Sequence, residues 1–104
     1  SAVQSQRGQV TINGLEITTI SAGGEDELFV QFSDSCWGEI VDAKGVEIYA
    51  DLNRDGDALR VSGVAPYSIL LGKGPSVSLQ FNGETVDVGR YTSSDDTAKL
   101  RLGR

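Results

Sequence analysis

The chain has 104 residues with a net charge of −6, and it contains one cysteine and no histidine. A single domain of this length can bury a stable core without a metal or a disulfide. The composition excludes an intrachain disulfide, a zinc site of the usual Cys/His kind and a catalytic Ser–His or Cys–His pair. The Lys and Arg residues are few and scattered, so nucleic acid is not an expected partner, and no cofactor is expected.

The first 26 residues are expected to form a flexible N-terminal segment, followed by a folded domain at residues 27–104. The segment begins with a polar stretch and ends with a Gly-Gly pair beside acidic residues, which is typical of a linker. Between these two parts, Asn13-Gly14 is a strong signal for a two-residue hairpin turn. This turn would place Val10 opposite Ile17, and it predicts an extra hairpin at residues 9–18.

Two alternating segments, 36–41 and 46–52, are expected to pair as the central hairpin of the folded domain. A turn of three residues, Ala43 to Gly45, would pair Ile40 with Ile48 and keep one face apolar, whereas a turn of two or four residues would bury a carboxylate. The three-residue turn also has a glycine at the position that needs a positive φ.

The segment that follows the central hairpin leaves two interpretations open. Residues 51–56 match the first half of a calcium-binding loop, with oxygen ligands at alternate positions and a glycine at the sharp turn. The twelfth position of that loop is Ser62 instead of a bidentate glutamate, and the flanking segments have a strand pattern. Alternatively, Asp55-Gly56 is a hairpin turn that pairs Leu52 with Leu59. The alternation of side chains favours the hairpin turn.

The outer face of the predicted hairpin carries aromatic and acidic side chains. Cys36 alternates in phase with the core residues, so its thiol is expected inside and the next side chain, Trp37, outside. The expected register places Trp37 opposite Asp51 and Glu39 opposite Tyr49. Exposed aromatics usually meet a partner, although a loop or the N-terminal segment could instead cover them. The candidate interaction surface consists of Trp37, Glu39, Tyr49, Asp51 and Arg60.

Further alternating segments follow along the rest of the chain. A strand at 67–71 ends in a Gly-rich turn at 72–76, and a closing strand is expected at 98–102. Between them, an Asn82-Gly83 hairpin turn would pair Leu79 with Val86 and Val77 with Val88. Seven strands between residues 27 and 102, at intervals of roughly ten residues, predict an all-β fold, a small antiparallel β-sandwich of immunoglobulin-like appearance.

Three short features occur in a fixed order between residues 27 and 102. Cys36-Trp37 is followed by Pro66-Tyr67, and then by Asn82-Gly83 with Val86-Asp87 close behind. In these features the chain resembles the C-terminal periplasmic domain of RodZ, a family of bacterial cell-shape proteins. Gly38 departs from the resemblance, because such domains tend to carry a bulkier apolar residue there, and the glycine leaves room beside Cys36.

The resemblance implies a non-catalytic interaction domain on the periplasmic side of the bacterial inner membrane. The parent protein would bind the actin-like filament MreB through a cytoplasmic domain and would cross the membrane once, upstream of this chain. The domain would then help to couple MreB to the periplasmic and inner-membrane proteins of cell-wall elongation. The chain itself has no apolar run near 18 residues, so it is expected to reach the membrane only through that upstream helix.

Two other functions fit the same candidate surface. A carbohydrate- or peptidoglycan-binding module would stack Trp37 and Tyr49 on sugar rings. A glycoside-acting enzyme would use Glu39 and Asp51 as its carboxylate pair. The enzyme is disfavoured, because two open-face acids beside Arg60 lack the enclosed apolar site that raises the pKa of a general acid.

Overall fold

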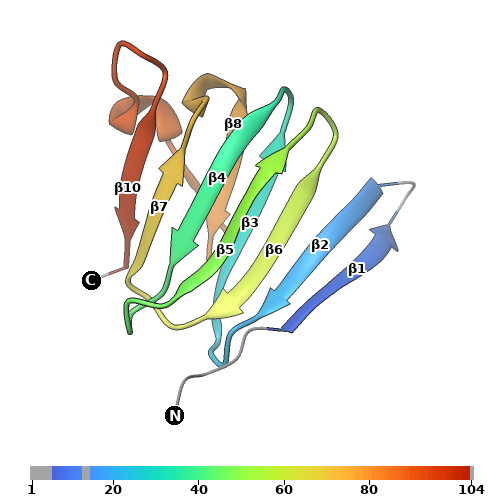
Figure 1. The fold of residues 1–104 in the computed structure, drawn as a ribbon. Helices are drawn as coiled ribbons and strands as arrows, with labels where there is room; N and C mark the ends of the chain where they lie inside the picture. The colour runs from blue at the N-terminus through green and yellow to red at the C-terminus, as the bar shows by residue number, and fades with distance from the viewer. Residues whose placement is uncertain (1–5, 13–14, 104) are drawn as a thin grey trace.

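The computed structural model describes the backbone of residues 6–12 and 15–103, and side chains from residue 17 onward. Within this part of the chain there are ten strands and two short 3-10 helices (Figure 1). The strands are β1 (Gln6–Ile12), β2 (Leu15–Ser21), β3 (Asp26–Phe32), β4 (Cys36–Val41), β5 (Glu47–Asn53), β6 (Ala58–Gly63), β7 (Tyr67–Leu71), β8 (Val77–Phe81), β9 (Glu84–Val86) and β10 (Ala98–Leu102). The 3-10 helices are η1 (Gly74–Ser76) and η2 (Val88–Tyr91).

The strands form two sheets. One has six strands in the order β1-β2-β6-β3-β8-β9, and the other has four in the order β10-β7-β4-β5. All neighbouring strands are antiparallel except β2 and β6, which are parallel. Figure 1 shows the four-stranded sheet in front of β3 and β8. The prediction of an all-β sandwich is confirmed, with eight strands between residues 26 and 102 in place of the seven expected.

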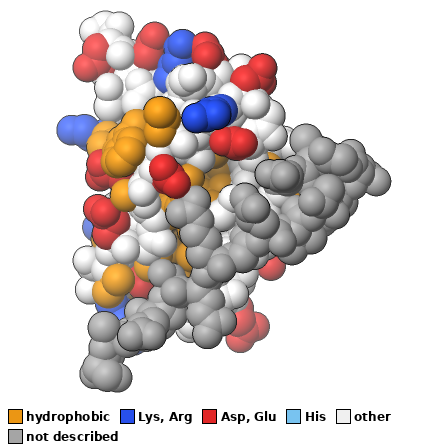
Figure 2. All heavy atoms as spheres, turned by 45° about the vertical axis from the view of Figure 1, so that its right-hand side comes forward, with side chains coloured by type: hydrophobic (Ala, Val, Ile, Leu, Met, Phe, Trp, Pro, Cys, Tyr) orange, Lys and Arg blue, Asp and Glu red, His pale blue; other side chains and the backbone are white. Residues whose placement is uncertain are grey.

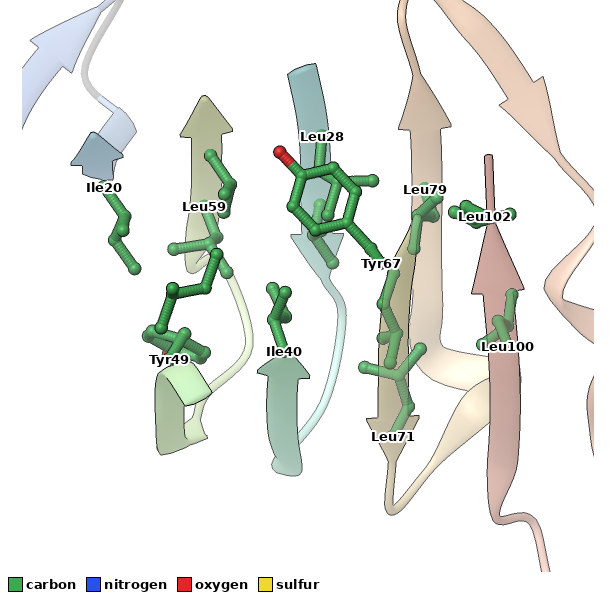
Figure 3. Packing of buried hydrophobic residues seen from close by; sticks show 14 of the residues in the cluster. Ile20, Leu28, Ile40, Tyr49, Leu59, Tyr67, Leu71, Leu79, Leu100 and Leu102 are labelled. Carbon is green, nitrogen blue, oxygen red and sulfur yellow. The ribbon is translucent and has the colours of Figure 1, made fainter. Parts of the chain in front are cut away.

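The core lies between the two sheets. Figure 3 shows Leu28, Leu59 and Leu79 of the six-stranded sheet pointing toward side chains of the four-stranded sheet. Each such leucine stabilises the fold by roughly 2 kcal/mol through burial of its apolar surface. The predicted alternation is clearest in β10, where Ala98, Leu100 and Leu102 are buried and the two residues between them are exposed.

Tyr67 lies at the centre of this core and joins the two sheets. Its side chain is fully buried, and its ring meets the ring of Phe81 edge-on at 6.3 Å between centroids. Its hydroxyl donates a hydrogen bond of 2.6 Å to the backbone carbonyl of Asp26 in β3. Burial raises the pKa of Tyr67 to about 12, because it disfavours the phenolate.

The N-terminal hairpin is part of the six-stranded sheet. The predicted pairing of Val10 with Ile17 is confirmed, whereas the Asn13-Gly14 turn lies outside the described residues. Strand β2 pairs with β6, Ile20 joins the core, and the backbone N–H of Ala22 donates to the carbonyl of Ser62 at 2.6 Å. A marginal isolated hairpin is stabilised by such docking. The flexibility of the first 26 residues and a domain boundary at residue 27 stay predictions.

The turn between β4 and β5 has the predicted three residues, but the register beyond it differs from the prediction. Gly45 has a φ of +78°, and the backbone N–H of Asp42 donates to the carbonyl of Val46 at 3.0 Å. A β-bulge then follows, so Ile40 pairs with Tyr49 and the predicted Ile40–Ile48 pair is wrong. The bulge allows two consecutive large side chains, those of Ile48 and Tyr49, to enter the core.

Strands β5 and β6 belong to different sheets, so the predicted Leu52–Leu59 pair is also wrong. Residues 54–57 do form a turn, with Gly56 at a φ of +90°, but the chain crosses here from the four-stranded to the six-stranded sheet. The end of β3 holds this crossing, because the Phe32 carbonyl accepts a hydrogen bond from the Gly56 N–H at 2.9 Å. The calcium-loop interpretation has no support here, since Asn53 at its third position points into the interior.

The Asn82-Gly83 turn is confirmed, with both residues at positive φ, of 49° and 84°. Leu79 pairs with Val86 as predicted. The predicted Val77–Val88 pair is wrong, because β9 ends after three residues and the chain turns into η2, where Val88 is buried against the core.

Candidate interaction surface

Strand β4 presents adjacent side chains to opposite sides of the four-stranded sheet. The Cys36 thiol points into the core with 2% of its surface exposed, whereas Trp37 is 43% exposed. The predicted phase of this strand is therefore confirmed. The aromatic ring stands on the outer face of the sheet, in one of its two inner strands.

The structure brings Trp37 together with Glu39 and with a residue that the sequence did not indicate. The indole Nε1 of Trp37 donates a hydrogen bond to Oε2 of Glu39 at 2.7 Å. The bulge in β5 places Leu52 directly opposite Trp37, and Leu52 is 56% exposed. Cross-strand partners share one face, so these side chains form a surface cluster that we call the Trp37 patch: Trp37, Glu39, Ala50 and Leu52. Figure 2 shows hydrophobic side chains gathered in this part of the surface, with acidic and basic side chains around them.

Tyr49 and Asp51 do not belong to the Trp37 patch. Tyr49 is buried in the core, and its hydroxyl donates a hydrogen bond to Oδ1 of Asn53. Asp51 lies opposite Gly38, on the side of the sheet away from the indole, and its carboxylate accepts a hydrogen bond from the Leu52 N–H at 2.8 Å. The placement of both on the outer face was wrong, because the bulge reverses the direction of every side chain that follows it in β5.

Arg60 lies on the outer face of the other sheet. It belongs to β6, and its guanidinium carbon stands 5.5 Å from the centre of the Phe29 ring of β3, at a distance typical of a cation–π contact. The predicted pairing of Arg60 with Asp51 was therefore wrong. It followed from the assumption that β5 and β6 form a hairpin.

Gly38 provides room that two polar side chains occupy. A Cβ atom at this position would lie 3.2 Å from Nδ2 of Asn53 and 3.7 Å from Cε2 of Tyr49. The same Nδ2 atom donates a hydrogen bond of 3.1 Å to the carbonyl of Cys36. The space beside Cys36 is thus filled by a buried Tyr49–Asn53 pair, which accounts for the glycine at position 38 of this chain.

A shallow groove of about 470 Å³ runs over β7 on the same outer face. Its side chains come from the three strands β4, β7 and β10, and they are Glu39, Val41, Ser68, Leu70, Lys99 and Arg101. The two cations stand along β10, and the acid stands across the groove on β4. The groove therefore has one basic and one acidic side, with an apolar floor at Leu70.

The chemistry of this face is that of contact and orientation. Aromatic and aliphatic side chains supply area, and the charges around them set the orientation of a partner. Among residues 6–12 and 15–103, no three His, Cys, Asp or Glu side chains gather as a metal site. In the same ranges, no helix has the length and hydrophobicity needed to cross a membrane.

A β-sandwich with an aromatic patch and charges on an open sheet face has the features of an interaction domain. The chain belongs to the RodZ C-terminal domain family, whose sequence profile matches residues 30–101, more than half of its length. The resemblance seen in the short sequence features is thereby confirmed. The family consists of non-enzymatic interaction domains of cell-shape proteins. No solved structure matches the chain.

Proposed function

We propose that the chain is the periplasmic interaction domain of a membrane-anchored cell-shape protein, and that it helps to couple the MreB filament to the cell-wall elongation machinery. Membership of the RodZ C-terminal domain family supports this assignment at the level of a cell-shape protein. The observation that carries the binding role is the Trp37 patch, where a tryptophan and a leucine stand exposed side by side.

The Trp37 patch has the properties of a binding hot spot. Tryptophan is among the residues that contribute most to binding energy when a partner covers them. The hydrogen bond to Glu39 already holds the indole, so less side-chain entropy is lost when a partner orders the ring. The partners of this domain would be periplasmic or inner-membrane proteins of cell-wall elongation.

The carbohydrate-binding alternative is weakened by the position of Tyr49. That hypothesis relied on two exposed rings, and the ring of Tyr49 is buried in the core. Only Trp37 of the two is available for stacking on a sugar. The structure therefore favours a protein contact over the sugar platform.

The test uses the full-length parent protein in a rod-shaped bacterium depleted of its own copy. Replacing both Trp37→Ala and Leu52→Ser should abolish the recovery of rod shape. Tyr91→Ala is the matched control, because Tyr91 is 45% exposed but lies in η2, outside the patch. Rod shape restored by the double variant at normal protein level would show that the patch is not the contact.

The periplasmic location needs an independent measurement. A reporter enzyme that is active only in the periplasm, fused to the C-terminal end of the full-length protein, should be active. Activity of a cytoplasmic reporter at the same position would contradict the location.

A further inference from the structure

We propose that the outer face of the four-stranded sheet binds a second copy of the same domain and forms a two-fold symmetric dimer. This proposal rests on the proposed function, because it takes the outer face that carries the Trp37 patch as a contact surface and names a second copy as the partner. The distribution of charge and of side-chain size over this face supports such a dimer.

The charges on the face are separated across the sheet. Both exposed cations, Lys99 and Arg101, stand on β10 at one edge. The acids stand on the other half of the sheet, Glu39 on β4 and Glu47 on β5. Within the described residues, no ion pair joins either cation to an acidic side chain of the same chain. Each edge of the face therefore has charges available for a partner of opposite sign.

The register places these charges in two rows across the sheet. One row consists of Arg101, Ser68, Val41 and Glu47, and the next consists of Lys99, Leu70, Glu39 and Ala50. Each row begins with a cation on β10 and has its acid on β4 or β5. The face is thus positive at one edge and negative in the other half. If a second copy is laid on it with its strands in the opposite order, the positive edge of each copy meets the negative half of the other.

A two-fold axis in the plane of contact produces that reversal. If the axis runs along the strands between β7 and β4, it lays β10 of one copy over β5 of the other, and β7 over β4. Arg101 then lies across from Glu47 of the second copy, and Lys99 lies within reach of its Glu39. Because the contact is symmetric, each ion pair forms twice.

The sizes of the side chains follow the same symmetry. Strand β4 carries two large side chains on this face, which we call its ridge: Trp37, which is 43% exposed, and Val41, which is half-buried at the side of the groove. Strand β7 is low, with Ser68 along the groove and Gly72 immediately after the strand, where the Gly72 N–H donates to the Trp37 carbonyl at 2.8 Å. The axis that pairs the charges also sets the ridge of one copy over the groove of the other. Trp37 then faces Gly72 of the second copy, where no side chain stands in its way.

A second copy is the occupant that these observations favour. An unrelated partner would need charges and a surface shape that match this face. A second copy already has them, because the face is complementary to its own two-fold image. A four-stranded face is small for a protein interface, so we expect a dimer that dissociates on dilution below about 10 µM. Such an association would be favoured when two domains are held close together at a membrane.

The test is sedimentation velocity of the 104-residue chain from about 10 µM to 1 mM, at about 0.15 M salt to screen long-range repulsion. The wild-type chain should move from monomer to dimer across this range. Replacing Lys99→Glu and Arg101→Glu should weaken dimerisation at least about tenfold, since like charges then face each other. Replacing Glu39→Lys and Glu47→Lys should have the same effect.

The two charge-reversed variants supply the decisive sample. Mixed in equal amounts, they should form a one-to-one heterodimer, because each reversed edge then meets an edge of opposite sign. The control replaces Arg60→Glu and Arg90→Glu, which changes the net charge as much as Lys99→Glu with Arg101→Glu does, but these two residues lie on the other sheet and in η2. This control should dimerise within about twofold of the wild-type chain. Circular dichroism and urea unfolding of each variant serve as the check that it is folded.

Three results would overturn the proposal. The first is a wild-type chain that stays monomeric at the highest concentration, as expected if the face binds a peptide, a glycan or an unrelated protein. The second is a control that loses dimerisation as strongly as the face variants do. The third is a charge-reversed mixture that stays monomeric. A monomeric chain whose Trp37 variant still fails to restore rod shape would leave the proposed function intact, whereas a dimer whose Trp37 variant restores it would contradict that function alone.

Discussion

Trp37 and Glu39, two successive outward-facing residues of β4, are joined by a hydrogen bond of 2.7 Å between indole Nε1 and carboxylate Oε2. The two side chains lie two residues apart, so they share a face of the strand. The bond holds an exposed ring in one orientation before any partner arrives. The patch is therefore more ordered than exposure alone would indicate.

Removal of the carboxylate should release the indole. In Glu39→Ala we expect faster local rotation of Trp37 in time-resolved fluorescence anisotropy, which reports this ring alone because the chain has one tryptophan. The free energy of unfolding should change by less than about 1 kcal/mol, since the bond is exposed to water. Glu47→Ala is the control, because it removes an acid from the same face without contact to the indole. Equal anisotropy decays in all three proteins would show that the bond does not hold the ring.

A larger residue at position 38 should destabilise the fold. Gly38→Val would push its side chain against the Asn53 amide and the Tyr49 ring, so we expect a loss of about 1–3 kcal/mol in urea unfolding. Gly72→Ala is the matched control, because its new Cβ would meet its nearest neighbour at 3.5 Å, an ordinary contact distance. Adding Asn53→Ala to Gly38→Val should recover part of the loss if the clash is the cause.

The buried hydroxyl of Tyr67 should make stability depend on pH in alkaline solution. Its folded-state pKa of about 12 lies above the unfolded value near 10, so the unfolded chain loses its proton first as the pH rises. The contribution is therefore fully present below pH 10 and is lost between about pH 10 and 12, by an amount of the order of 2 kcal/mol. Urea unfolding of the wild-type chain and of Tyr67→Phe should diverge over this interval, because the variant lacks the titrating group.

At neutral pH, Tyr67→Phe should itself reduce stability by about 1–3 kcal/mol, because the Asp26 carbonyl then loses a buried donor. A variant as stable as the wild-type chain would mean that water replaces the hydroxyl.

Asp42 should stabilise the turn between β4 and β5 through its side chain. One carboxylate oxygen accepts hydrogen bonds from the N–H groups of Lys44 and Val46, at 2.9 and 3.0 Å. Asp42→Ala leaves both donors without this partner, so we expect a loss of about 1–2 kcal/mol in thermal unfolding. Asp42→Asn keeps an acceptor oxygen and should retain most of the stability. Equal losses in both variants would indicate that the charge, and not the hydrogen bonds, matters.

Local signals predicted the turns and the phase of most strands. Asn82-Gly83 and Gly45 have the positive φ angles that their sequences indicated, and Cys36 and Trp37 point to opposite sides as their alternation required. These features depend on a few neighbouring residues. A glycine at a turn and a period of two along a strand are visible without knowledge of the rest of the fold.

The parts that were wrong depend on one extra residue and on contacts distant in sequence. The only local signal of the bulge was a pair of adjacent large side chains, Ile48 and Tyr49. The predicted alternation continued past them as if β5 had no bulge, so each later side chain was placed on the wrong face. The assignment of β5 and β6 to different sheets depends on the end of β3 at Phe32, more than twenty residues earlier. Neither effect alters the composition or the spacing of the strands. The predicted number of strands was therefore close to the observed number, whereas Tyr49, Asp51 and Arg60 were wrongly assigned to the surface around Trp37.

The extra residue in β5 also decides the chemistry of the surface. Deletion of Ile48 would remove the bulge and leave the rest of β5 in its present register, with Tyr49 still opposite Ile40 and Leu52 still opposite Trp37. If β5 instead kept Ile48 and paired regularly from Glu47, Tyr49 would lie opposite Glu39 on the outer face and Leu52 would point inward, so the bulge alone decides whether this face offers an aliphatic or an aromatic contact.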